Sequence, residues 1–317
     1  MIYYQSENAS LLCGDCLRLL SLLPDKSVNC CVTSPPYFGL RDYGCNGQIG
    51  LEQTPDEYVA KLVSVFREVK RVLRDDGTLW LNLGDSYAGS GKGSNPDGTP
   101  HPSRLLGKQG TNTGTVTGKN MPQKASAIGL KSKDLIGIPW RVAFALQQDG
   151  WYLRQDIIWH KPNPMPESVK DRCTKAHEYI FLLSKSPKYY FNNEAIKDPV
   201  KQDWGTRDRK NGKYHNEGSG LQPHSGLEKS YEKANKRSVW TVTTKPFKGA
   251  HFATFPPDLI EPCILAGCPK DGVVLDTFNG AGTVGVVVAK HSRRYLGIEL
   301  NPEYCQITLN RWGVKDA

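Results

Sequence analysis

The sequence predicts an α/β fold in which a doubly wound, mostly parallel sheet is interrupted by irregular basic inserts. The first observation is the order strand, loop, helix, strand near the N-terminus. The apolar run Val28–Thr33 predicts a buried strand, and Thr78–Leu83 predicts a second one. Between them, Pro55–Leu73 gathers its apolar residues on one helical stripe, with Thr54 as the expected N-cap and 75–77 (DDG) as the expected stop. This order describes one βαβ unit of a parallel sheet.

The second observation is that strand-like and helical segments return in the later part of the chain, with no internal repeat. Apolar periodicity predicts helices at Ile138–Gln148, Thr283–Lys290 and Pro302–Trp312. Apolar, β-branched runs predict strands at Tyr152–Trp159, His177–Leu183, Val273–Thr277 and Tyr295–Leu300.

The third observation is a pair of polar stretches that interrupt this frame. Residues 86–135 carry seven Lys/Arg against two Asp and have almost no large apolar residues, which predicts a mobile loop. Residues 193–240 are again polar and rich in turn formers. The chain therefore divides into 1–85, the basic insert 86–135, a core segment 136–192, the polar segment 193–240 and a closing part 241–317.

Composition limits the classes of protein that the chain can be. The net charge of +9 and a sequence pI near 9.0 suit a polyanionic partner such as DNA. No apolar run approaches the roughly 20 residues of a membrane-spanning helix, and the N-terminus lacks a secretory signal, so we expect no membrane partner and a cytoplasmic location.

The nine cysteines fit the same setting. Their odd count and scattered positions do not resemble a disulfide framework. Cys13 and Cys16 have CxxC spacing, but Cys263 and Cys268 have the wrong spacing to complete a zinc site, and no His cluster accompanies them. We therefore expect no metal and partly buried, reduced thiols.

A glycine-rich loop near the C-terminus indicates a cofactor site. Residues 276–285 (DTFNGAGTVG) join a predicted strand to a predicted helix, where glycines allow a sharp turn and the helix start offers free N–H groups. Glu299 ends the next strand, where its carboxylate can accept hydrogen bonds from both ribose hydroxyls.

Two cofactors remain open for this loop. Gly280, Gly282 and Gly285 also satisfy the GxGxxG pattern of a dinucleotide-binding dehydrogenase. Against a dehydrogenase, Asp276 would repel a pyrophosphate but tolerate the cationic methionine part of S-adenosylmethionine. The pattern also falls at the end of the chain, whereas a dehydrogenase fingerprint tends to open its domain.

The stretch Thr33–Tyr37 (TSPPY) ends the first predicted strand and is the main candidate for catalysis. Ligands of open α/β sheets bind at this edge. The Ser34 hydroxyl and the Pro35 carbonyl can accept hydrogen bonds from an exocyclic amino group and free its delocalised lone pair. Pro35 and Pro36 hold the loop in advance. Tyr37 offers a flat face for an extruded base.

This stretch resembles the catalytic motif of the DNA amino-methyltransferases, and Asp276–Gly282 resembles their cofactor motif. Having the catalytic motif first and the cofactor motif last resembles the circularly permuted β group of that family. Further matches are 14–15 (GD), 77–85 (GTLWLNLGD), 159–163 (WHKPN), 177–178 (HE) and 251–256 (HFATFP).

The resemblance implies a Rossmann-like methyltransferase fold, S-adenosylmethionine as cofactor and DNA as partner, with 1–85 as the catalytic half and 241–317 as the cofactor half. It implies base flipping and a place in restriction-modification. The catalytic residues would be Ser34, Pro35, Pro36 and Tyr37. The cofactor would be bound by Asp15, Thr33, Phe255, Asp276, Phe278, Gly280, Gly282, Thr283 and Glu299.

The resemblance also implies which base is methylated and where DNA binds. Serine at position 34 is typical of cytosine-N4 enzymes, whereas Asp or Asn is typical of adenine-N6 enzymes, which remain the alternative. The family places target recognition in 193–240, and the insert 86–135 is a second DNA-contact candidate. The expected DNA-binding residues are Lys108, Lys119, Lys124, Arg207, Arg209, Lys210 and Arg237.

Other interpretations stay open at this point. An RNA methyltransferase or a protein glutamine methyltransferase also needs acceptors around an amine or amide, and a DNA-binding protein could keep a degenerate methyltransferase fold. We expect a monomer or a homodimer.

Overall fold

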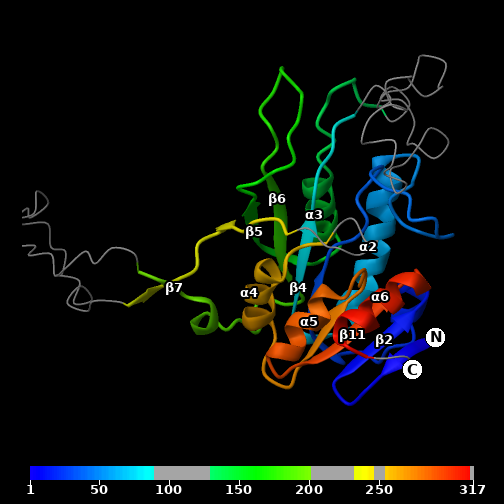
Figure 1. Ribbon diagram of the computed structural model, residues 1–317, viewed down its shortest axis with the longest axis vertical. Coiled ribbons are helices and arrows are strands. Elements are labelled where there is room, and N and C mark those ends of the chain that lie inside the picture. Colours follow the sequence, from blue (N-terminus) through cyan, green and yellow to red (C-terminus); the bar gives the residue numbers. More distant parts are fainter. Residues whose placement is uncertain (89–128, 201–231, 246–253, 315–317) are drawn as a thin grey trace, which may run out of the picture. The chain divides into compact units, whose positions relative to one another are not determined.

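The computed structural model describes residues 1–88, 129–200, 232–245 and 254–314. The chain forms two compact units, Met1–Asn192 with Ser238–Ala317, and Asn193–Arg237 (Figure 1). The inner part of the basic insert and the residues Arg207, Arg209 and Lys210 lie outside the described residues.

The first unit is built on one mixed sheet. Its order in the described residues is β1-β2-β11-β10-β3-β4-β6-β5-β9. The strands are β1 (Ile2–Gln5), β2 (Ala9–Cys13), β3 (Val28–Thr33), β4 (Leu73–Leu83), β5 (Tyr152–His160), β6 (His177–Ser184), β9 (Val239–Thr241), β10 (Val273–Asp276) and β11 (Arg294–Glu299). From β2 to β4 all neighbours are parallel, whereas β1 on β2, β6 on β4 and β5 on β6 are antiparallel. The predicted α/β fold with a mostly parallel sheet is confirmed.

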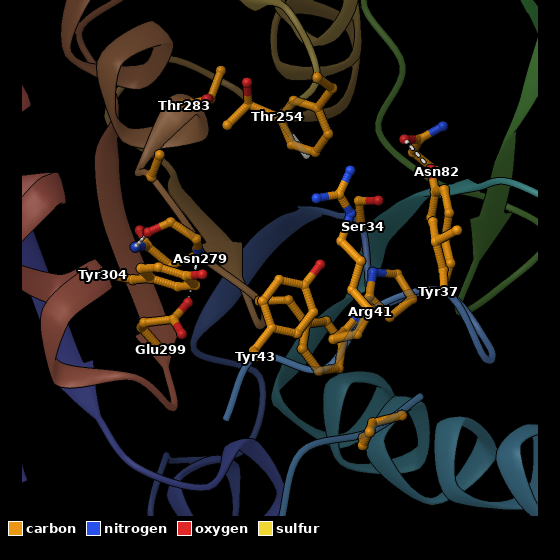
Figure 2. A pocket seen from close by; sticks show the side chains of 18 of the residues that line it. Ser34, Tyr37, Arg41, Tyr43, Asn82, Thr254, Asn279, Thr283, Glu299 and Tyr304 are labelled. Carbon is orange, nitrogen blue, oxygen red and sulfur yellow. Dashed lines mark hydrogen bonds between the residues drawn. The ribbon is translucent and has the colours of Figure 1, made fainter. Parts of the chain in front are cut away.

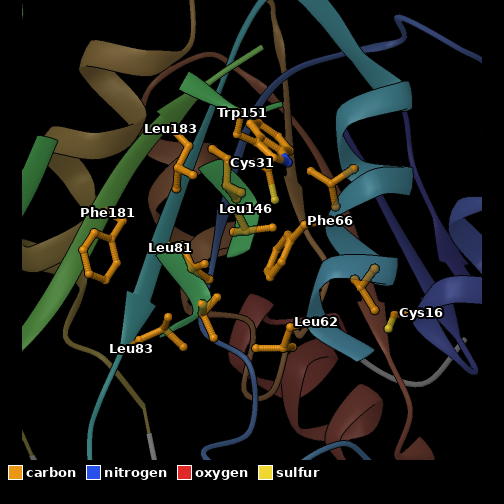
Figure 3. Close-up of a cluster of buried hydrophobic side chains, with 14 of the residues drawn as sticks. Cys16, Cys31, Leu62, Phe66, Leu81, Leu83, Leu146, Trp151, Phe181 and Leu183 are labelled. Carbon is orange, nitrogen blue, oxygen red and sulfur yellow. The ribbon is translucent and has the colours of Figure 1, made fainter. Parts of the chain in front are cut away.

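Helices cover both faces of this sheet. They are α1 (Cys16–Leu20), α2 (Pro55–Val72), α3 (Ile138–Gln148), α4 (Pro257–Gly267), α5 (Thr283–Lys290) and α6 (Pro302–Trp312). Cys31 on β3 packs in a cluster with Phe66 of α2 and Leu146 of α3 (Figure 3). Its neighbour Cys30 faces the other side, where a Cβ on Gly267 of α4 would lie 2.9 Å from the Cys30 sulfur. Because side chains alternate along a strand, the sheet is buried on both sides, as its continuous apolar strands require.

The sheet has a topological switch point between β10 and β3. These two strands are parallel neighbours, with Leu275 opposite Cys31. From β3 the chain passes through α2 to β4 on one side, and from β10 through α5 to β11 on the other. The loops that leave the carboxyl ends of β3 and β10 therefore diverge and leave a crevice, which is where open α/β sheets bind ligands.

Most predicted elements are found at or within one residue of their expected bounds, but the expected stop at 75–77 is wrong. Helix α2 begins with a capping box between Thr54 and Glu57 and ends at Val72. Residues 75–77 instead belong to β4, which begins at the fully buried Leu73. Asp75 is exposed and forms an ion pair with Lys26, so a strand can hold this charged residue at the surface. The sequence patterns also gave no indication of β1, β2, α1, α4 and β9.

The basic insert is closed at its base. The backbone N–H of Ala88 donates to the carbonyl of Asp134 at 2.8 Å, and that of Ile136 donates to the carbonyl of Ser86 at 3.0 Å. The Asp85 carboxylate accepts from the N–H groups of Gly137, at 3.0 Å, and Ile138, at 3.1 Å, which begin α3. An acidic group at a helix N-terminus satisfies donors that have no partner within the helix. The two ends of the insert are thus anchored to the sheet.

The described part of the second unit is small. It consists of a 3₁₀ turn (Glu194–Ile196) and the antiparallel pair β7 (Asp198–Pro199) and β8 (Lys233–Ala234). Lys236 pairs with Asp198 at 2.9 Å. Trp240, which was expected within the polar segment, belongs to β9 in the first unit. Across the described ranges, no helix combines the length and apolar character needed to cross a membrane.

Candidate active site

A cavity of about 700 Å³ opens at the carboxyl ends of the central strands. This volume lies within the range of small-molecule and cofactor sites. Its wall combines Ser34, Pro35, Pro36 and Tyr37 from the end of β3 with Phe278, Gly280 and Glu299 from the ends of β10 and β11. Figure 2 shows Ser34 and Tyr37 on one side and Glu299 on the other. The fold therefore brings both sequence motifs, which lie more than 200 residues apart, to one cavity.

The TSPPY loop (residues 33–37) is fixed by hydrogen bonds with neighbouring segments. The hydroxyl of Tyr58, a fully buried residue of α2, donates to the carbonyl oxygen of Pro36 at 2.8 Å. The N–H of Gly39 donates to the carbonyl of Gly50 at 2.8 Å, which closes the loop that follows. Pro35 is buried and Ser34 is half-buried at the wall. Two prolines and the Tyr58 anchor thus fix the loop before any ligand arrives, which is the condition for electrostatic preorganisation.

Tyr37 ends the motif and enters a polar network. Its hydroxyl donates to Glu178 Oε2 at 2.7 Å and approaches Asn82 Oδ1 at 3.2 Å. Glu178 is also ion-paired with Lys161, whose ammonium lies 4.2 Å from the centre of the Trp159 ring. Burial, followed by the charge of Glu178, raises the pKa of Tyr37 well above its usual value.

The Tyr37 ring packs closely against the backbone at Gly84. A Cβ placed on Gly84, just after β4, would lie 2.4 Å from Tyr37 Cε2. Only a glycine leaves room for the ring in this position. Part of the ring is therefore covered by backbone, while Tyr37 still contributes to the cavity wall. Its contact with an extruded base stays a prediction.

The cofactor loop and Glu299 form one unit. Glu299 Oε2 accepts from the N–H of Gly280 at 2.7 Å, and Oε1 accepts from the N–H of Asn301 at 2.9 Å. Burial raises the pKa of Glu299 to about 7, and the two backbone N–H groups oppose this shift. Each carboxylate oxygen keeps a second lone pair for a ligand hydroxyl. The contact of Glu299 with a ribose stays a prediction.

The turn itself depends on a close contact. Gly282 has a φ of 69°, and a Cβ there would lie 2.6 Å from Thr308 Cγ2 of α6. Gly282 does not itself line the cavity. Its contribution is to let the loop pass close to α6, so that Gly280 and Thr283 reach the wall.

Two expected cofactor residues lie behind the cavity wall. Thr33 and Asp276 are 0 % and 1 % exposed and do not line the cavity. The Thr33 hydroxyl donates to Asp276 Oδ1 at 2.7 Å, and the N–H of Phe278 donates to the same oxygen at 3.1 Å. Burial raises the pKa of Asp276 to about 7, and these two hydrogen bonds oppose the shift. This buried hydrogen bond therefore links β3 to the cofactor loop behind the cavity wall. Neither Thr33 nor Asp276 is exposed to the cavity, so their direct contact with the cofactor stays a prediction.

Three of the remaining predicted residues line the cavity. Asp15 lines the cavity and caps α1, accepting from the N–H of Arg18 at 2.8 Å. Phe255 and Thr283 also line it. Of the expected DNA-binding residues, Arg237 alone is described, and it belongs to the second unit. Where the chain is described, no three His, Cys, Asp or Glu side chains gather to hold a metal ion.

Several lining residues were not predicted from the sequence. Arg41 and Tyr43 come from the loop after the motif, Asn82 from β4, and Asn279 and Tyr304 from the cofactor side (Figure 2). The rings of Tyr43 and Tyr304 meet edge-to-face at 6.2 Å. The one available signal was proximity: Arg41 and Tyr43 follow the motif by only a few residues, and Asn279 lies inside the cofactor loop.

Comparison with known proteins identifies the family. The DNA methylase family matches residues 28–310. The type II methyltransferase M.Cfr9I of Citrobacter freundii is 49% identical over 309 residues, covering 98% of this chain and 89% of that protein. The type II methyltransferase M.XycI of Xanthomonas campestris pv. cyanopsidis is 48% identical over 96% of this chain and 87% of that protein. The chain belongs to the N4/N6 family of DNA methyltransferases.

Solved structures support the same fold. The PvuII DNA methyltransferase (cytosine-N4-specific) aligns with a TM-score of 0.64 at 19% identity, covering 98% of this chain and 88% of that one. A putative DNA modification methylase of Thermus thermophilus, solved in complex with S-adenosyl-L-methionine, aligns with a TM-score of 0.58 at 22% identity, covering 96% and 92%. The cofactor of this methyltransferase is S-adenosylmethionine, and the dehydrogenase alternative is wrong.

Proposed function

We propose that the protein is a type II DNA methyltransferase that methylates the exocyclic N4 amine of a flipped cytosine. The observation that carries the proposal is the meeting of Ser34 and Pro35 with Glu299 at one cavity on the switch point of the sheet. Two hydrogen-bond acceptors for an amine and a carboxylate suited to a ribose line the same cavity. This arrangement suits transfer of a methyl group from a nucleoside cofactor to a base.

The Ser34 hydroxyl and the Pro35 carbonyl supply the acceptors for the amine hydrogens. The lone pair of an exocyclic amine is delocalised into the ring, and two acceptors aimed at its hydrogens favour a tetrahedral nitrogen. Because Tyr58 fixes Pro36 from below, these oxygens need little reorganisation during the reaction. S-Adenosylmethionine supplies an electrophilic methyl group on a sulfonium. The amine proton is left to solvent.

The cofactor is proposed to lie along the β10–β11 side of the cavity. Glu299 would accept from the ribose hydroxyls, and the N-terminus of α5 offers N–H groups that no side chain caps. Phe255 and Phe278 would provide apolar walls, and Asp15 is a further polar group at this end. The donor set of the cavity thus fits a nucleoside carrying a cationic amino acid.

Cytosine is proposed over adenine because of the residue at position 34. Serine there is typical of cytosine-N4 enzymes in the family that the motif resembles. The name of the PvuII neighbour specifies cytosine N4, and that protein aligns with nearly the whole chain. DNA contact is proposed for the two basic inserts, 86–135 and 193–240, because they hold much of the positive charge.

The test is nucleoside analysis of methylated DNA. Plasmid DNA is methylated by the purified protein, digested to nucleosides and separated by chromatography with mass detection. N4-Methylcytosine is the expected product, and N6-methyladenine without N4-methylcytosine would overturn the choice of base. Ser34→Ala should abolish most of the activity, whereas Ser64→Ala on α2 should not. Full activity of Ser34→Ala would reject the proposed site.

A further inference from the structure

The β5–β6 loop, residues 161–176, lies at the edge of the sheet where the cavity opens. Because β6 is antiparallel to both β4 and β5, β5 ends at the same edge as β4, and the loop begins there. Figure 1 shows the loop as a long green hairpin that projects beyond β5 and β6. Three of its residues, Lys161, Asn163 and Met165, line the cavity. The loop therefore forms part of the cavity wall.

The strand order places this loop on the side of the cavity away from the cofactor strands. The sheet runs β11-β10-β3-β4-β6-β5, so Ser34, which follows β3, lies between the proposed cofactor side and the loop. The nucleophile in a methyl transfer approaches the methyl carbon from the side opposite the sulfur, in line with the bond that breaks. With the cofactor along β10 and β11, the target base therefore reaches Ser34 from the side on which the loop lies.

Met165 combines exposure with a place on the cavity wall. It is 85 % exposed, and of the large apolar side chains that are exposed in the described ranges it alone lines the cavity. Prolines precede and follow it at positions 164 and 166. Each proline fixes its own φ, which stiffens the stretch that carries the methionine. Single exposed apolar residues are common on protein surfaces, so the position of Met165 is more informative than its exposure.

Both arms of the loop are tied to neighbouring segments. On the outgoing arm, the Asn163 side chain accepts from the N–H of Thr244 at 3.0 Å and donates to the Thr244 carbonyl at 3.2 Å. On the returning arm, the Lys175 ammonium donates to the carbonyl of Asp85 at 3.1 Å. Because the loop is held at both arms, contact of Met165 with a ligand displaces the loop little.

An exposed apolar side chain at this place suits DNA from which a base has been extruded. Extrusion breaks the base pair and the stacking of the base, and it leaves a gap in the duplex. Proteins that unstack DNA insert apolar side chains between base steps, methionine among them. The loop also carries four Lys/Arg against two Asp/Glu, which suits the phosphates on either side of such a gap.

We propose that Met165 inserts into the bound duplex beside the target base and occupies the space that the extruded base leaves. It stabilises the extruded state by burying its apolar surface between neighbouring base pairs. In this role Met165 touches neither the cofactor nor the amine, so it acts on extrusion and not on the transfer step. The inference rests on the proposed extrusion of the target base, whichever base is methylated.

Met165→Ala tests the insertion on a synthetic duplex that carries the site methylated in the plasmid, as located by modification-sensitive sequencing. The rate of methyl transfer is measured in a single turnover with enzyme and S-adenosylmethionine in excess, which removes product release from the measurement. With the normal base pair at the target, we expect the rate to fall roughly tenfold or more. With a mismatched base opposite the target, extrusion costs less, and the rate should fall by no more than about twofold.

The comparison of the two losses decides the outcome. An equal loss on the paired and the mismatched duplex would overturn the insertion and indicate that Met165 positions the base after extrusion. An undiminished rate on the paired duplex would overturn it as well. Met165→Leu keeps an apolar side chain of similar volume and should retain most of the wild-type rate on the paired duplex. A rate as low as that of Met165→Ala would contradict the insertion.

Controls separate this inference from misfolding and from the proposed function. Leu22 is 73 % exposed and precedes β3, so it lies at the opposite edge of the sheet, and Leu22→Ala should leave both rates unchanged. The affinity for S-adenosylmethionine should be unchanged in Met165→Ala. If Ser34→Ala keeps full activity, the proposed function fails. If Ser34→Ala is inactive while Met165→Ala loses the same rate on both duplexes, only the insertion fails.

Discussion

We expect the proposed contact of Glu299 with the cofactor ribose to make cofactor binding depend on pH near neutrality. Its carboxylate lies between two backbone N–H groups and is 9 % exposed, and burial raises its pKa to about 7. The neutral form would place a hydrogen on an oxygen that the proposed ribose contact needs as an acceptor. We therefore expect the ionised form to bind S-adenosylmethionine and the protonated form to bind it poorly.

The magnitude follows from the fraction of ionised Glu299. With a pKa of about 7, roughly nine-tenths of the carboxyl groups are ionised at pH 8 and about one-tenth at pH 6. The Kd for the cofactor should thus rise about tenfold over this range. Asp276, whose pKa is also about 7 and whose charge raises that of Glu299, spreads the transition over a wider range.

Equilibrium dialysis with labelled S-adenosylmethionine, repeated across this pH range, measures the effect. Glu299→Gln should bind weakly at every pH and lose most of the slope. Glu303→Gln, an exposed carboxylate nearby on α6, should keep the wild-type profile. A wild-type Kd that stays constant from pH 8 to pH 6, or an equal slope in Glu299→Gln, would refute the reasoning.

Two further predictions concern the groups around the cavity. Because the folded-state pKa of Asp276 is raised from 3.8 to about 7, its contribution to stability is present at acidic pH and is lost as pH rises through 7. Asp276→Asn keeps Oδ1 as an acceptor for Thr33. Its free energy of unfolding should exceed that of the wild type by up to about 4 kcal/mol at pH 8 and by less at pH 5. Urea unfolding at both pH values checks this, and an equal difference at the two pH values would contradict it. In Gly84→Ala the new Cβ would lie 2.4 Å from the Tyr37 ring. This change should lower the free energy of unfolding by about 1–3 kcal/mol, or displace the ring and lower kcat. Denaturation and turnover assays check it, and a variant unchanged in both would show that the ring has room.

Local patterns in the sequence were enough to predict much of the fold. The N-cap at Thr54, the apolar stripe of α2 and the glycines before α5 are patterns among residues close in the chain. Such patterns depend little on the rest of the molecule. The stop expected at 75–77 failed because β4 begins at Leu73, whose burial against other elements outweighed the local turn preference.

The sequence alone determined which segments are candidates for the chemistry: a proline-stiffened end of one strand, a glycine turn after another, and a carboxylate at the end of a third. Only the tertiary structure decided how these side chains are used. Asp276 lies behind the wall rather than in it, and Tyr37 gives its hydrogen to Glu178, a residue 141 positions away. Burial and hydrogen-bond direction depend on strand order and register, which bring together residues that are distant in the chain and that no local pattern connects.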